Sequence, residues 1–136
     1  MTKQELVMDT LKQMGYRPSI DDDGDVKFRH NMRTYYAQLG DREQEDHPFV
    51  SLLLPNITEV EEAQIPTMLL VCNKAARQLK LVKLCMDENL SRLHASCEFF
   101  YRDQDSLREY LEHSIKILSI MPIWVYESYH DLSDSE

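Results

Sequence analysis

Hydrophobic and polar residues recur along the chain with two different periods, and each period predicts one kind of element. Near the N-terminus, Val7 and Leu11 belong to an apolar series with a spacing of three to four residues, which predicts a helix over residues 2–14. Thr2 and Glu5 have the spacing of a capping box at the start of this helix.

Alternation with a period of two follows, and it predicts strands. Residues 26–30 and 33–39 each place apolar side chains on one face and mostly polar side chains on the other. Residues 49–54 are nearly all apolar, which favours a covered central strand that ends at Pro55. The predicted strands cover residues 26–30, 33–39, 49–54, 81–86 and 90–101, with a possible short strand at 16–20.

Two further helices are predicted, and each contains a proline. The second covers roughly residues 59–79, but Pro66 belongs in a first turn, so we expect either a kink or a helix that starts near Ile65. The third begins near Asp105, and Pro122 should kink or end it. The predicted fold class is α+β, an antiparallel sheet flanked by helices in the order α-β-β-β-α-β-β-α.

The composition is that of one globular domain. The 136 residues are 43% hydrophobic and 29% charged, with only three glycines, so a sizeable core is expected and long linkers are not. We expect a single domain over residues 1–130 and a short acidic tail over residues 131–136.

Charge and cysteine usage exclude several classes of function. The formal net charge is −9 and no basic cluster stands out in the sequence, which disfavours binding to nucleic acid or to an anionic membrane. Three cysteines cannot pair completely, and neither a signal peptide nor a membrane span is visible. The expected location is the cytoplasm.

The acidic segment 21–25 is the strongest candidate for a metal site. A calcium loop with Gly24 at its sixth position would begin at Ser19 and end at His30, so the required final glutamate is absent. Asp and Gly are also the usual residues of a hairpin turn, which is the interpretation we prefer.

No catalytic, metal-binding or cofactor-binding residue can be assigned. The five histidines lack ligand spacing, and three glycines cannot build a phosphate-binding loop. The three cysteines lie within apolar helix or strand patterns, where a thiol usually serves as a small hydrophobic group. The protein is therefore not expected to be an enzyme.

One run of five apolar residues raises the question of a binding surface. Consecutive helical residues differ by about 100°, so such a run surrounds the helix. One sheet can cover only one side, which favours an interface on the other side over simple burial. Trp124 poses the same question in the third helix. The candidate interface residues are Met68, Leu69, Leu70, Val71, Cys72 and Trp124.

Several segments in a fixed order resemble a known family. They are Ile20–Phe28 around the acidic turn, Arg33–Leu39, the strand FVSLLL, the helix end Cys72–Ala76 and the strand Leu81–Leu84. Together with the last helix, they resemble the bacterial YbjN family, whose domain is similar in fold to type III secretion chaperones. The resemblance implies a regulatory or chaperone-like protein that binds extended segments of its clients, commonly as a dimer, and it carries over no catalytic residue.

Two hypotheses for function follow. The first is a non-enzymatic protein-binding module, acting as a chaperone, adaptor or regulator, that forms a homodimer and binds a protein partner that the sequence does not identify. The alternative is a regulatory domain that responds to a small ligand or a metal, through the acidic turn or an apolar pocket.

Overall fold

The structure is a computed structural model that describes residues 1–40 and 47–134. Part of the predicted polar loop after Gly40, at residues 41–46, lies outside the described residues. A six-stranded antiparallel sheet with the strand order β1-β2-β3-β4-β6-β5 forms the centre, and helices cover one of its faces. The predicted fold class and the predicted order of elements are confirmed, with the short additional strand present as β1.

The bounds of the elements are close to those that the periodicity predicts. The helices are α1 (Lys3–Gln13), α2 (Ile65–Gln78) and α3 (Gln104–Asp134), and a 3-10 turn, η2 (Glu62–Gln64), precedes α2. The strands are β1 (Ser19–Ile20), β2 (Val26–His30), β3 (Arg33–Gln38), β4 (Phe49–Glu59), β5 (Val82–Met86) and β6 (Arg92–Phe100).

Three sequence-based boundaries need correction. Pro55 does not end its strand, because β4 continues to Glu59 through an irregularity between Leu54 and Thr58. A bulge tolerates a proline, which has no N–H to donate to a neighbouring strand. Pro122 does not end α3, and residues 131–134 of the predicted acidic tail continue that helix.

The second helix begins where the alternative placed it. α2 starts at Ile65 with Pro66 in its first turn, and Glu59 belongs to β4 instead of to the helix. A proline in the first turn costs little because the first N–H groups of a helix have no partner within the helix.

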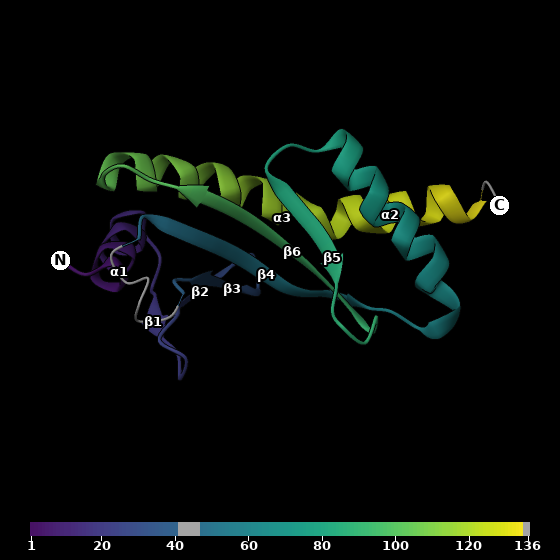
Figure 1. Ribbon diagram of the computed structural model, residues 1–136, viewed down its shortest axis with the longest axis horizontal. Helices are drawn as coiled ribbons and strands as arrows, with labels where there is room; N and C mark the ends of the chain where they lie inside the picture. The colour runs from purple at the N-terminus through teal and green to yellow at the C-terminus, as the bar shows by residue number, and fades with distance from the viewer. Residues whose placement is uncertain (41–46, 135–136) are drawn as a thin grey trace.

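The core lies between the helices and one face of the sheet. Alternate residues of β2, β3, β4, β5 and β6 are buried, for example Val26 and Phe28 in β2, while the residues between them are mostly exposed or half-buried. α3 runs the length of the molecule, with α1 near its start and α2 across its C-terminal half (Figure 1). Among the residues that the structure describes, no helix lies on the opposite face of the sheet.

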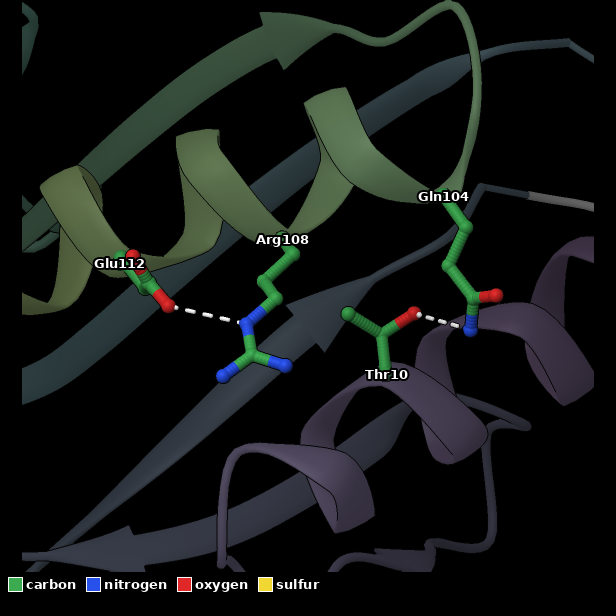
Figure 2. Close-up of polar contacts among 4 residues, drawn as sticks. All are labelled: Thr10, Gln104, Arg108 and Glu112. Carbon is green, nitrogen blue, oxygen red and sulfur yellow. Dashed lines mark hydrogen bonds and ion pairs between the residues drawn. The ribbon is translucent and has the colours of Figure 1, made fainter.

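Polar contacts join the first and last helices. The Gln104 side-chain amide donates to Thr10 Oγ1 at 3.2 Å (Figure 2). It also donates to Asp9 Oδ2 at 2.8 Å, so the start of α3 is held against α1. One turn further, Arg108 Nε donates to Glu112 Oε1 at 3.0 Å within α3. The latter pair is exposed and contributes little to stability.

The apolar stripe of α3 should dominate the stability of the domain. Leu118 is completely buried, whereas Ile120 on the same helix is 52% exposed. Leu118→Ala should lower the free energy of unfolding by about 2–5 kcal/mol through lost burial and an unfilled cavity. Ile120→Ala, the matched control, should change it by about 0.5 kcal/mol or less. Urea denaturation followed by circular dichroism measures both, and equal effects would contradict this assignment of the core.

Candidate protein-binding surface

The structure divides the apolar run of α2 between the core and the surface. Met68 and Val71 are buried, Cys72 is half-buried, and Leu69 and Leu70 are 50% and 48% exposed. The buried positions recur at the spacing of one helical face, which also includes Ala75. Five apolar residues in a row therefore supply one buried face and leave two leucines in contact with solvent.

Trp124, the remaining candidate, lies on α3 where that helix meets α2. Its side chain is half-buried, and Lys74 Nζ lies 5.7 Å from the centre of its ring. The same ammonium group donates to Ser128 Oγ at 3.4 Å. Lys74 follows Leu70 by one helical turn on α2, so these two side chains project from the same side of that helix. The structure thus brings the six candidate residues onto two packed helices.

α3 carries further exposed apolar residues besides the six candidates. Ile123 and Tyr126 are 66% and 67% exposed, and Ile120 is also exposed. Their signal in the sequence is the segment IMPIWVY, which contains more apolar residues than one buried stripe requires. We call Leu69, Leu70, Ile120, Ile123, Trp124 and Tyr126 the α2/α3 surface.

A small pocket lies beside the α2/α3 surface. Its volume is about 380 Å³, and its lining includes Met68, Pro122, Val125 and Tyr126 together with Ile57 from β4. Its lining also includes charged or titratable side chains from separate elements, namely Arg33, Glu59 and His130. Sequence analysis missed this pocket because its residues come from five elements, β3, β4, η2, α2 and α3, spread between positions 33 and 130.

The acidic segment 21–25 forms a turn whose carboxylates bind the backbone. Asp21 Oδ1 accepts hydrogen bonds from the amides of Asp23 and Asp25 at 2.9 and 3.0 Å, and Gly24 has a positive φ of 83°. Asp25 Oδ1 accepts from the Leu39 amide at 3.0 Å, while burial raises the pKa of Asp25. These contacts are those of a turn, and within the described residues no three His, Cys, Asp or Glu side chains are grouped to hold a metal.

Two histidines and two cysteines have the contacts or the burial that are typical of residues with a structural role. His94 Nδ1 accepts from the Asn56 amide at 3.0 Å and so satisfies the backbone of the β4 irregularity, and His30 Nδ1 lies 3.3 Å from the Tyr16 hydroxyl. Burial raises the pKa of both Cys72 and Cys97 to about 11, which keeps these thiols protonated at neutral pH. A protonated thiol is a poor nucleophile.

Comparison with known proteins supports the fold and leaves the function open. No profile of a known protein family matches the sequence, and no curated protein matches it. Several solved chains do match, and two of them match over nearly the whole chain at sequence identities that establish similarity of fold alone.

The first is YbjN from E. coli, described as a transcription regulator on a provisional basis. It has 10% sequence identity and a TM-score of 0.67, and the match covers 93% of this chain and 91% of that one. The second is the HopA1–SchA chaperone–effector complex, at 15% identity and a TM-score of 0.50, with 96% and 92% of the two chains covered. The resemblance to YbjN and to type III secretion chaperones is confirmed at the level of fold.

Within residues 1–40 and 47–134, no helix has both the length and the apolar character needed to cross a membrane. The longest, α3, carries charged side chains along its exposed side, for example Glu109, Lys116 and Glu127.

The three thiols should differ sharply in reactivity. Cys85 is exposed, Cys72 is half-buried and Cys97 is buried. At pH 8 we expect an aromatic disulfide reagent to modify one thiol quickly, and the Cys85→Ser variant should lose this fast phase. The other two thiols should react fully only after denaturation, because their raised pKa values leave little thiolate. A fast phase that persists in Cys85→Ser would show that Cys72 or Cys97 is activated.

Proposed function

We propose that this protein is a non-enzymatic protein-binding module, acting as a chaperone, adaptor or regulator in the cytoplasm. The observation that carries the proposal is the α2/α3 surface, on which six large apolar side chains are partly or largely exposed on two packed helices. Exposed apolar area of this kind is a common feature of surfaces that bind other proteins. The fold is compatible with this function, because the second solved neighbour is a chain of a chaperone–effector complex.

The chemistry of the α2/α3 surface suits protein recognition. Trp and Tyr are favoured anchors in protein interfaces because they combine a large apolar area with a polar group and few rotatable bonds. Trp124 and Tyr126 provide such anchors beside the aliphatic Leu70 and Ile123. The pocket of about 380 Å³ next to Tyr126 could receive one side chain of a partner.

We further propose that two copies associate through the exposed side of α2. Leu69 and Leu70 are too exposed to stabilise the monomer fully, and a two-fold contact would bury both leucines of each copy. Two-fold dimers are the commonest homo-oligomers, and an isologous contact needs only one apolar patch. The exposed residues of α3 then remain for a protein partner.

A charge at position 70 should dissociate the dimer. In Leu70→Glu a carboxylate would be buried against an apolar partner, so the dimer should weaken by at least tenfold in its dissociation constant, about 1.4 kcal/mol. Ile20→Glu is a matched control, because Ile20 is 49% exposed against 48% for Leu70 and lies on β1. Light scattering across a tenfold concentration range measures both variants. A wild-type monomer at every concentration would refute the dimer, and a dimer that tolerates Leu70→Glu would move the interface toward Trp124.

Proximity labelling can test the partner site separately. A photo-crosslinking amino acid at position 123 on α3 should capture one specific protein in cells of the native host, while the same group at position 20 should not. Both positions are exposed, so general surface reactivity is controlled. Trp124→Ala in the same chain should reduce the crosslink if the α2/α3 surface binds that protein. An equal yield from the two positions would count against the surface.

A further inference from the structure

The uncovered face of the sheet contains a basic groove of about 640 Å³ at its β1 edge. Its lining includes three cationic side chains, Arg17, Lys27 and Arg29, and several hydroxyl-bearing side chains, among them Thr34 and Tyr36. The strand register explains this grouping, because Lys27 pairs with Tyr36 and Arg29 pairs with Thr34. Their neighbours Val26 and Phe28 point to the core, so these residues point to the open face.

The cations of this groove are not neutralised by the rest of the described chain. The side chains of Arg17 and Lys27 make no hydrogen bond or ion pair with any described residue, and Arg29 Nη2 donates only to the Met32 carbonyl oxygen at 2.9 Å. The carboxylate nearest to Lys27 along the chain is that of Asp25. It is hydrogen-bonded to the Leu39 amide instead of to a cation of the groove. Like charges that share one face of a sheet repel one another, and this cost falls when an anion lies between them.

One feature of the fold opposes an anion at this place, and local hydrogen bonds weaken it. Gly15 lines the groove just after the C-terminus of α1, where helix carbonyl groups concentrate negative charge. The Gly15 amide donates to the Lys12 carbonyl oxygen and the Tyr16 amide to that of Leu11, both at 3.0 Å. Two of the terminal carbonyl groups therefore already have partners.

We propose that this groove binds a small phosphorylated molecule. Arginine offers planar pairs of N–H donors that fit phosphate oxygens, and lysine adds a compact positive charge. The hydroxyl groups of Thr34 and Tyr36 supply further donors, and the volume lies within the usual range for small-molecule sites. The molecule's phosphate lies among Arg17, Lys27 and Arg29, and its remaining part contacts Tyr36.

Two other anionic ligands fit the groove less well. A nucleic acid would need basic side chains along an extended path. The net charge of this protein is −9, and the three cations of the groove are confined to one end of the sheet. An acidic protein segment presents carboxylates at intervals of several ångströms, which matches a compact cluster of cations less closely than one phosphate group does.

Titration of the full isotope-labelled chain with inorganic pyrophosphate tests the proposal by nuclear magnetic resonance. Ionic strength is held constant with sodium chloride, and no divalent metal is added. We expect saturable shifts confined to the amides of β1, β2 and β3 that border the groove. The double variant Arg17→Gln/Lys27→Gln should bind at least tenfold more weakly, and its spectrum reports whether it remains folded.

A control variant removes the same amount of charge elsewhere. Arg77→Gln/Lys80→Gln neutralises two exposed cations at the end of α2 and should bind pyrophosphate as the wild type does. Shifts that do not saturate, or equal weakening in the two double variants, would overturn the proposal in favour of general electrostatic attraction. A hexaglutamate peptide that binds the groove more tightly than pyrophosphate would overturn it in favour of an acidic protein segment. Neither result depends on the α2/α3 surface.

Discussion

Burial of the apolar stripe of α3 against one face of the sheet is the contact on which the rest of the structure depends. Leu107, Leu111 and Leu118 are fully buried, and α3 packs on the central strands β4 and β6, which contribute completely buried residues such as Leu52 and Leu93. Removal of this apolar area from water is the main favourable term in folding. α1 and α2 pack at the two ends of α3, so both depend on its position.

One-sided burial leaves the molecule with two different free surfaces. On the helical side, α2 can bury only the face that meets β5 and α3, which leaves Leu69 and Leu70 exposed. On the sheet side, strand alternation places every second residue in solvent, which is where Lys27 and Arg29 lie. The apolar surface and the basic groove therefore arise from the same layer arrangement, with the groove at the β1 edge of the sheet and α2 packed on β5 at the other edge.

The fold was predictable from the sequence because its determinants are local. Alternation in residues 26–30 and 33–39, and the three-to-four spacing of apolar residues in the last helix, require no knowledge of distant contacts. The errors lie at prolines. Whether Pro55 and Pro122 end an element depends on tertiary contacts that hold the chain on either side, such as the bond from the Asn56 amide to His94 Nδ1.

The candidate sites were only partly predictable, because each depends on pairing between distant segments. Five consecutive apolar residues in α2 imply an exposed apolar face, but which residues occupy it depends on how α2 docks on β5 and α3. The contact of Lys74 with Trp124 joins positions fifty residues apart. The groove has no signature in composition, since the chain is acidic overall. It exists because the register of β2 with β3 places Lys27 beside Tyr36 and Arg29 beside Thr34, so a local excess of positive charge is compatible with a net charge of the opposite sign.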